Sequence, residues 1–304
     1  MAGKQKLGFA ENFALGGLAA VISKTVAAPL ERVKLLLQNQ DEMIKAGRLD
    51  KPYNGMIDCT KQIYYNEGVI PFWRGNVANC IRYFPTQALN FAFKDKIHLL
   101  FKDSPTDTYA WKFTKNIFSG GVAGGMSLCV VYSLDYARTR LANDAVKEGS
   151  ERQYKNLRDV YKQTLKTDGI RGLYRGFGVS VVGIMVYRGF YFGLYDSFKP
   201  ILLSPDAGFL LRFGVAYCVT IAATMLSYPF DTIRRRMMMK SGEAVKYKSS
   251  FDAARQIIKH EGIQSFFKGN LANILRGVAC AGVLAGYDMF EKWWIAYRFG
   301  DMAS

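Results

Sequence analysis

Pairs of opposite charge three residues apart recur at three corresponding places in this chain. They are Glu31 with Lys34, Asp135 with Arg138, and Asp231 with Arg234. Proline stands two residues before the acid in the first and third copies, and serine takes its place in the second. Carboxylates and basic side chains at such positions can join helices through ion pairs, because residues three apart lie on one face of a helix.

A second motif follows each pair and reads acid, glycine, four residues, aromatic, base, glycine. Its copies are Glu67–Gly75, Asp168–Gly176 and Glu261–Gly269. Both motifs recur in the same order at offsets of about 100 residues, which indicates an internal repeat. The sequence therefore predicts a single domain over residues 1–304, built from three repeats at residues 11–101, 111–203 and 209–299.

The composition limits the classes of function. The chain has 41 Lys and Arg against 25 Asp and Glu, a net charge of +16, which predicts an anionic partner: nucleic acid, anionic lipid or a phosphorylated metabolite. Its five cysteines are scattered and odd in number, so neither a disulfide framework nor a metal site is expected. The two histidines stand apart from any nucleophile and no Walker-type loop is present, so an enzyme is not expected.

Each repeat has the same internal plan. Apolar segments lead into the first motif at residues 11–38, 111–143 and 209–239, and others follow the second motif at residues 75–101, 176–203 and 269–299. These segments are long enough to cross a bilayer, which takes about 20 residues. Between them lie short amphipathic patterns at residues 56–66, 157–167 and 251–260. We therefore predict an all-α membrane protein, a three-fold pseudo-symmetric bundle of six tilted transmembrane helices with three short surface helices on one side.

The distribution of basic residues gives the orientation of this bundle. An even number of spans puts both termini on the same side of the membrane. The polar stretches inside the repeats carry 26 of the 41 Lys and Arg residues. By the positive-inside rule, that side faces the interior compartment.

The tripled motifs identify a family. Residues 11 to about 299 resemble the mitochondrial carrier family, which is defined by three copies of Pro-x-[Asp/Glu]-x-x-[Lys/Arg] and of the second motif. The resemblance implies a multi-pass protein of the mitochondrial inner membrane, with the short helices on the matrix side and both termini in the intermembrane space. It also implies a functional monomer that works by alternating access, with a single central site between two salt-bridge gates.

A hexapeptide narrows the expected substrate. The run Arg234-Arg235-Arg236-Met237-Met238-Met239 resembles the signature of the family members that exchange ADP for ATP. The resemblance implies electrogenic exchange of cytosolic ADP for matrix ATP, both free of magnesium, and inhibition by carboxyatractyloside and bongkrekic acid. Two alternatives stay open: another nucleotide carrier, such as one for Mg-ATP and phosphate, and a basic nucleic-acid-binding protein, which would need no glycine-rich spans.

The charged pairs predict a matrix gate. Around a three-fold bundle, each acid can reach the base of the next repeat, which pairs Glu31 with Arg138, Asp135 with Arg234, and Asp231 with Lys34. The alternative is a solvated helix end at which the base is favoured by the macrodipole. Gln38 resembles the family's glutamine brace on this network. Arg235 is expected to contact either substrate or Gln38, Arg236 to bind neighbouring backbone or the gate, and the three methionines to pack.

The opposite, cytoplasmic gate is predicted to be weaker. The family pattern [Phe/Tyr]-[Asp/Glu]-x-x-[Lys/Arg] is complete only at Asp196 and Lys199. The first copy keeps the acid, Asp95, but has His98 in place of the base, which leaves a histidine partner as an alternative; Asp288 is followed by Glu291 where a base belongs. We expect one strong pair, Asp95 with Lys199, and repulsion between Asp196 and Glu291. A low barrier to opening on the intermembrane side, and a carrier that rests open there, would follow.

Broken symmetry between the repeats predicts the substrate site. Seven residues past the last glycine of the second motif stand Arg82, Gly183 and Arg276. A charge within a span costs about 2.5–3.5 kcal/mol on insertion scales, so these bases and Lys24 must face a cavity. Guanidinium groups match phosphate oxygens bidentately, so Lys24, Arg82 and Arg276 can hold a phosphate chain.

A slot for a flat base is predicted beside these phosphate ligands. Gly183 permits close approach, Ile184 can pack and Tyr187 can stack, although Tyr187 could equally be a packing residue. The resemblance assigns Lys24, Arg82 and Arg276 to phosphates, and Gly183, Ile184, Tyr187 and Ser227 to adenine. Asn90 and Arg188 are expected to line the same cavity.

Anionic lipid is the remaining expected partner, with no other cofactor. Glycine N–H groups at helix starts can bind phosphate, and the family binds cardiolipin at such sites. The expected lipid residues are Arg74 with Gly75, Arg175 with Gly176, Lys268 with Gly269, and Gly55 of the surface motif Tyr53-Asn54-Gly55. Asn156 and Ser249 replace glycine in the other two surface motifs.

Overall fold

The computed structural model describes residues 9–100, 108–145, 152–202, 208–241, 243 and 247–279. Within these ranges, all regular secondary structure is helical. The predicted all-α architecture is therefore confirmed for the part of the chain that the structure describes.

The first long helix of each repeat carries the charged-pair motif. These helices are α1 (Phe9–Lys45), α4 (Tyr109–Ala142) and α8 (Phe209–Met239). Pro29 lies inside α1 and Pro229 inside α8, and each helix continues past its proline. Helix α1 runs beyond the predicted end at Gln38, and its last turns bury Met43 completely in an apolar cluster.

The second long helix of each repeat begins directly after the second motif. Helix α3 covers Asn76–Leu100 and α7 covers Phe177–Leu202. Residues 270–279 are helical in the third repeat, and the remainder of the predicted segment to residue 299 lies outside the described residues.

The predicted amphipathic helices are present as α2 (Met56–Glu67), α5 (Leu157–Thr167) and α9 (Ser250–Glu261). Each buries two residues four apart, the spacing of one helix face: Cys59 and Ile63, Val160 and Thr164, Ala253 and Ile257. Asn156 and Ser249, which replace glycine, act as N-caps and accept backbone hydrogen bonds at 3.0 and 3.1 Å.

Short helical turns inside the second motif were not expected from the sequence. They are η1 (Ile70–Trp73), α6 (Gly169–Leu173) and η2 (Ile263–Phe267). Each turn is followed by a motif glycine with positive φ, at Gly75, Gly176 and Gly269. Only glycine adopts that conformation without strain, so this glycine lets the chain reverse into the next long helix.

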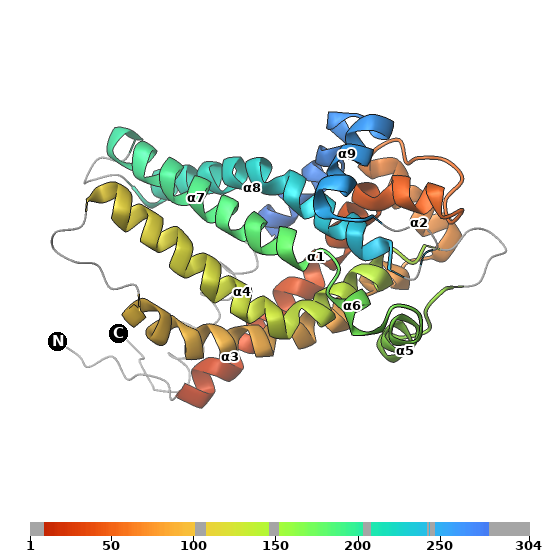
Figure 1. The fold of residues 1–304 in the computed structure, drawn as a ribbon, viewed down its shortest axis with the longest axis horizontal. Helices are drawn as coiled ribbons and strands as arrows, with labels where there is room; N and C mark the ends of the chain where they lie inside the picture. Colours follow the sequence, from red (N-terminus) through yellow and green to blue (C-terminus); the bar gives the residue numbers. More distant parts are fainter. Residues whose placement is uncertain are drawn as a thin grey trace, which may run out of the picture.

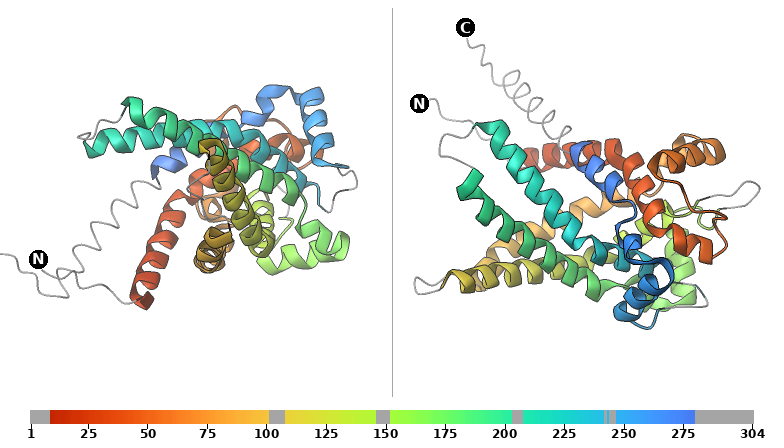
Figure 2. Two further views of the ribbon diagram at one scale, coloured as in Figure 1. Left: turned by 60° about the vertical axis from the view of Figure 1, so that its left-hand side comes forward. Right: turned by 90° about the horizontal axis from the view of Figure 1, so that it is seen from above.

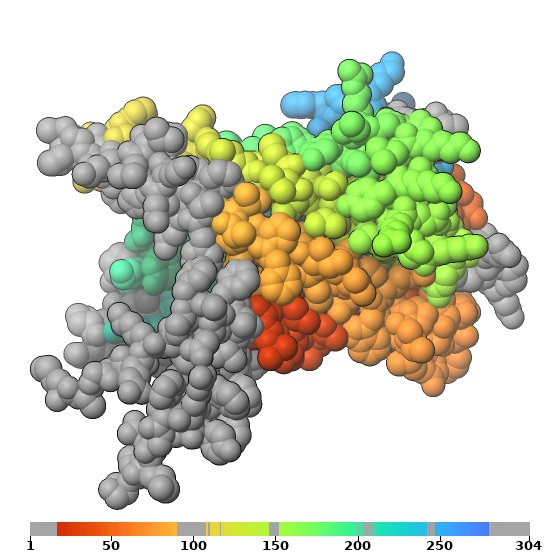
Figure 3. Space-filling model, turned by 90° about the horizontal axis from the view of Figure 1, so that it is seen from below, coloured from red at the N-terminus to blue at the C-terminus, as the bar shows by residue number. Residues whose placement is uncertain are grey.

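The long helices draw together at one end and spread apart at the other (Figures 1 and 2). The short helices α2, α5, α6 and α9 gather at the end where they converge (Figure 1). Helix α3 packs against α4, and α7 against α8, so consecutive repeats adjoin. Figure 3 shows one face of the molecule on which side chains of α3 and α4 form a continuous surface.

Three stretches of the described chain are long and apolar enough to cross a membrane, at residues 110–142, 169–199 and 211–239. Helix α1 is long enough but contains Lys24, Glu31, Arg32 and Lys34. These charges lower its hydropathy, and they must be shielded from lipid by the protein interior.

Candidate functional site

Three inter-repeat ion pairs close the end at which the long helices converge. Lys34 Nζ lies 3.0 Å from Asp231 Oδ2, Glu31 pairs with Arg138, and Asp135 pairs with Arg234. We call these six residues the charge ring. The structure thus brings together each acid with the base of the next repeat, as the sequence predicts. Because the side chains are largely buried, each charge depends on its partner.

Asp231 is the most heavily bonded acid of the charge ring. Its Oδ2 atom accepts hydrogen bonds from Lys34, from Gln38 at 3.3 Å and from Arg235 at 3.1 Å. Gln38 also donates to Thr232 Oγ1 at 2.9 Å. Gln38 therefore lies across the Lys34–Asp231 pair, at the position expected of a brace.

The adjacent arginines meet different partners because neighbouring helix residues point about 100° apart. Arg235 donates to Asp231 and to Thr139 Oγ1 at 3.1 Å, so it joins α8 to the second repeat. Arg236 is fully buried and binds Asp41 at 2.8 Å, Ser265 at 2.7 Å, Glu261 and the carbonyl of Gln38 at 3.3 Å. Of the two expectations for Arg236, backbone contact is observed, but its carboxylate partners were not foreseen.

Each motif glycine packs against the backbone of a charge-ring base. A Cβ built at Gly75 would lie 3.0 Å from the carbonyl oxygen of Arg138. The corresponding distances are 3.0 Å from Gly176 to Arg234 and 2.8 Å from Gly269 to Lys34. The second motif of one repeat therefore supports the gate residue of the next.

The basic residues of the predicted lipid sites are engaged by carboxylates. Arg74 lies 2.5 Å from Asp144 and Lys268 2.8 Å from Asp41, so both join neighbouring repeats. Arg175 lies 3.4 Å from Asp168 of its own repeat. Ser241 donates to that same Asp168 at 3.0 Å. Gly55 has a positive φ and open space around its Cα, which leaves it accessible.

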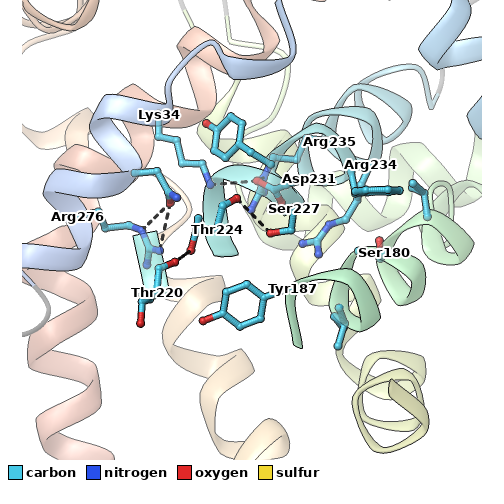
Figure 4. A pocket seen from close by; sticks show the side chains of 16 residues that line it. Lys34, Ser180, Tyr187, Thr220, Thr224, Ser227, Asp231, Arg234, Arg235 and Arg276 are labelled. Carbon is cyan, nitrogen blue, oxygen red and sulfur yellow. Dashed lines mark hydrogen bonds and ion pairs between the residues drawn. The ribbon is translucent and has the colours of Figure 1, made fainter. Parts of the chain in front are cut away.

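A cavity of about 410 Å³ borders the charge ring and is lined by α7, α8, Lys34 of α1 and the helical residues 270–279 (Figure 4). Four basic side chains and one acidic side chain line it, and the other lining residues are apolar, aromatic or uncharged and polar. The lining residues are Lys34, Val179, Ser180, Gly183, Ile184, Tyr187, Thr220, Thr224, Ser227, Tyr228, Phe230, Asp231, Arg234, Arg235, Asn273 and Arg276. The volume falls in the usual range for small-molecule sites, about 300–1,000 Å³.

The α7 wall of the cavity is apolar and aromatic. Gly183 packs closely against Phe230 of α8, because a Cβ added at Gly183 would lie only 3.1 Å from Phe230 Cβ. Tyr187 stacks on Tyr191 with ring centroids 6.0 Å apart, and Tyr191 stacks on Tyr195 at 6.1 Å. The aromatic column therefore continues from the cavity along α7.

The α8 wall carries hydroxyl groups that the sequence argument missed. Thr220 and Thr224 line the cavity beside the predicted Ser227. Their spacing of four and three residues, on one helix face, could have revealed them. Arg276 faces the same space and donates to Asn273 Oδ1 at 3.3 Å (Figure 4).

Three predicted ligands lie elsewhere in the described structure. Lys24 Nζ stands 5.4 Å from the ring centroid of Tyr83, and Arg82 donates to Asn79 Oδ1 at 3.4 Å. Arg188 packs against α4, where a Cβ added at Gly120 would clash with its guanidinium. Arg188 is not among the residues that line this cavity, and its expected place beside the substrate stays a prediction.

Some predicted residues lie outside what the structure describes. These are Asp288 and the side chains of Asn90 and Asp95. Asp196 and Lys199 are described and exposed on α7, and Lys199 Nζ lies 6.0 Å from the ring centroid of Tyr195. In the described part of the chain, no group of His, Cys, Asp and Glu side chains is arranged to hold a metal ion.

Comparisons with known proteins agree with this geometry. The family model described as "Mitochondrial carrier protein" matches residues 5–105, 110–206 and 205–298. The chain is 63% identical to the "ADP,ATP carrier protein" of Neurospora crassa over 288 residues, 93% of this chain and 92% of that one. It is 60% identical to the protein of the same name from Kluyveromyces lactis, over 95% of this chain and 96% of that one.

Proposed function

The chain belongs to the mitochondrial carrier family, and on that premise we propose that it exchanges ADP for ATP across the mitochondrial inner membrane. Relatives about 60% identical over more than nine tenths of this chain carry the name ADP,ATP carrier. The observation that carries the proposal is the cavity, which sets a cluster of bases beside an aromatic slot.

The two ends of a nucleotide match two parts of this cavity. Arg276, Lys34 and Arg235 offer positive charge for a di- or triphosphate. Gly183, Ile184 and Tyr187 offer a narrow apolar wall on which a purine can lie. Arg82 and Lys24, in the adjoining helices, would take phosphate oxygens as substrate enters.

The charge ring supplies the matrix gate of this proposal. Lys34, Asp231 and Arg234 belong both to the ring and to the cavity lining, so a bound phosphate competes with Asp231 and Asp135 for their bases. Substrate binding thereby offsets the loss of the ion pairs and lowers the barrier to opening, as an enzyme does for a transition state. An empty carrier lacks that compensation, so transport is an obligatory exchange.

The exchange is electrogenic because ADP and ATP without magnesium differ by one negative charge. One charge moved across the membrane corresponds to about 2.3 kcal/mol per 100 mV. A potential negative on the matrix side therefore favours ATP leaving and ADP entering. Transport, not a chemical reaction, is the proposed activity.

As a carrier with helices able to cross a bilayer, the protein is a mitochondrial membrane protein. We assign the inner membrane and put α2, α5 and α9 on the matrix side and both termini in the intermembrane space. Cardiolipin binds at the motif glycines in this proposal, and the protein works as a monomer. Carboxyatractyloside and bongkrekic acid are expected to inhibit it.

Exchange in liposomes tests the proposal. The purified full chain is reconstituted with cardiolipin, loaded with ADP inside and supplied with labelled ADP or ATP outside, without magnesium. We expect uptake that requires internal adenine nucleotide and rejects GTP and AMP. Loss of one charge-assisted contact is worth about 1.5–3 kcal/mol, so Arg276→Ala should lower kcat/KM by about 10- to 150-fold.

Arg276→Lys is the matched variant, because it keeps the charge and loses the planar fork. It should retain more activity than Arg276→Ala. Uptake that needs magnesium, or that exchanges for phosphate alone, would overturn the substrate assignment and point to a different nucleotide carrier. Full activity in Arg276→Ala would overturn the assignment of this cavity.

A further inference from the structure

Three hydroxyl groups follow one another along the α8 wall of the cavity (Figure 4). Thr220 Oγ1 donates to the carbonyl of Ala216 at 2.7 Å, and Thr224 Oγ1 donates to the carbonyl of Thr220 at 2.7 Å. Ser227 Oγ donates to the carbonyl of Thr224 at 3.1 Å. Each hydroxyl proton is therefore held by the backbone of its own helix.

A hydroxyl has one proton and two acceptor lone pairs. When the proton is bound within the helix, the oxygen offers only acceptors to whatever lies beside it. Thr220, Thr224 and Ser227 stand at spacings of four and three residues, so their oxygens share one face of α8. The cavity thus has a wall that accepts hydrogen bonds and donates none from these groups.

This wall borders the same space as the surface on which the base is proposed to lie. Figure 4 shows the side chain of Tyr187, from α7, near those of Thr220 and Thr224 in the cavity. Arg276, a donor that lines the same cavity, turns its Nε and Nη2 atoms to Asn273 Oδ1, at 3.4 and 3.3 Å. A purine edge that faces α8 therefore meets oxygen acceptors.

We infer that Thr220 and Thr224 select the purine by its group at position 6, taking an amino group and rejecting a carbonyl. The inference rests on the proposed nucleotide exchange and extends it from Ser227 to two further residues. The amino group of adenine donates two hydrogen bonds and fits the wall. The carbonyl of hypoxanthine or guanine sets lone pairs against lone pairs and leaves its own oxygen without a donor.

The test compares ADP with inosine diphosphate, in which a carbonyl replaces the amino group. Exchange of each is measured in liposomes for the wild-type chain, Thr220→Val, Thr224→Val and the double variant, and kcat/KM is taken for both nucleotides. Valine keeps the shape of threonine and removes the oxygen. We expect each single variant to lower the ADP-to-IDP ratio by about 5- to 10-fold, mainly through poorer use of ADP.

Two variants serve as controls. Thr224→Ser keeps the oxygen and its backbone bond, so its ratio should stay at the wild-type value. Thr114→Val removes a hydroxyl with the same kind of bond, to Ala110 at 2.8 Å, from an exposed position of α4, and should also leave the ratio unchanged. Thermal unfolding of each purified variant shows whether it is folded.

The outcomes separate this inference from the proposed function. If the wild type exchanges ADP but both valine variants fold and keep its ratio, the wall does not select the base, and the inference falls alone. If the wild type exchanges no adenine nucleotide, the proposed function falls. A third nucleotide tests the inference on the wild-type chain alone. Purine riboside diphosphate, with hydrogen at position 6, should have a kcat/KM between those of ADP and IDP. IDP equal to ADP would overturn the inference.

Discussion

The run from Arg234 to Met239 shows how single residues of one helix serve three repeats. Arg234 binds Asp135 of the second repeat, whereas Arg236 binds Asp41 of the first. The methionines divide in the same way. Met237 packs against the apolar cluster of the third repeat, Met238 joins that of the second, and Met239 joins that of the first. A turn of about 100° per residue makes this division possible.

For charged residues that recur in all three repeats, the sequence predicted the ion-pair partner as well as the position. The partners of Asp231 and Arg234 followed from their equal spacing in every repeat. The partners of Arg236 did not: Asp41 belongs to neither repeated motif, and nothing in the sequence pairs Arg236 with Glu261, the acid of the third copy of the second motif. The direction of the Arg188 side chain could not be predicted for a related reason: its guanidinium packs against the bare backbone of Gly120 on α4, a neighbour that is visible only in space.

Among the three arginines Arg234–Arg236, Arg236 is the one whose removal should lower the free energy of unfolding most. It is fully buried, and Arg236→Ala leaves the carboxylates of Asp41 and Glu261 short of a partner. We expect a loss of about 3–5 kcal/mol in the free energy of unfolding, the usual cost of breaking a buried ion pair from one side. Denaturation in detergent measures it.

Lys45→Ala is the control for Arg236→Ala. Lys45 also binds Glu261, at 2.6 Å, but its side chain is 37% exposed. An exposed pair is worth about 0–1 kcal/mol. Equal losses in the two variants would contradict the claim that burial decides the cost.

Glu261 should make stability depend on pH. Burial raises the pKa of its carboxyl, but Arg236 and hydrogen bonds from Lys45, Arg236 and Ser265 outweigh burial and bring the pKa down to about 2 from an ordinary 4.5. A lowered pKa stabilises the folded state fully above pH 4.5, and this contribution is lost as the pH falls through about 2. Glu261→Gln should therefore destabilise the protein at pH 7 by about 1.5–3 kcal/mol.

The same variant should lose less additional stability than wild type when the pH is lowered from 4.5 toward 2. Thermal unfolding across that range, with both proteins in the same detergent, measures the difference. Parallel pH curves for the two proteins would show that Glu261 is not held ionised by its neighbours.

At the scale of elements, the sequence predicted where the helices lie but not which backbone groups of other repeats they pack against. The amphipathic period predicted α5 at its observed bounds, Leu157–Thr167, and located α2 and α9 to within a residue at each end. The turns η1, α6 and η2 were missed because they hold four or five residues, too few for a period to appear. Glycine signalled their ends, but the carbonyl packed against it comes from another repeat.

Replacing a motif glycine by alanine should lower the free energy of unfolding for two separable reasons: backbone strain at positive φ and a clash with neighbouring backbone. Gly269→Ala places a Cβ at φ +80° and 2.8 Å from the carbonyl oxygen of Lys34. Gly262→Ala imposes nearly the same φ, +81°, with nothing within 4 Å. The control should lose about 1–2 kcal/mol from conformational strain alone, and Gly269→Ala should lose more, because backbone must also move.

Gly269→Ala should also weaken the charge ring, since the displaced carbonyl belongs to Lys34, which pairs with Asp231. Unfolding free energies of the two variants test the first part, and the rate of exchange in liposomes tests the second. Equal stability of Gly269→Ala and Gly262→Ala would refute the idea that the motif glycine exists for close packing.

For the whole molecule, the two ends of the helix bundle differ in how many ion pairs and hydrogen bonds can hold them closed. At the end that we assign to the matrix, the charge ring is reinforced by Gln38 and by the outer pairs of Arg74 with Asp144 and Lys268 with Asp41. At the opposite end, only the sequence around Asp196 and Lys199 has the complete family pattern, and the third repeat has Glu291 in place of a base. We predict that the empty carrier rests closed to the matrix and open to the intermembrane space.

Supplying the missing base should shift that balance. Glu291→Lys, a change outside the described residues, would turn the repulsion predicted between this position and Asp196 into attraction, and should strengthen the gate on the intermembrane side. With the native cysteines replaced by serine and a reporter cysteine at Thr224 in the cavity, a charged, membrane-impermeant thiol reagent is added from that side. One exposed ion pair is worth up to about 1 kcal/mol, so the labelling rate should fall by about fivefold. Lys199→Gln, which removes the only base of the pattern, should raise it instead. The reporter chain without a gate mutation is also labelled from the matrix side. If its cysteine reacts faster from that side, the assignment of the resting state is reversed, because the tightly paired end would then be the one that opens.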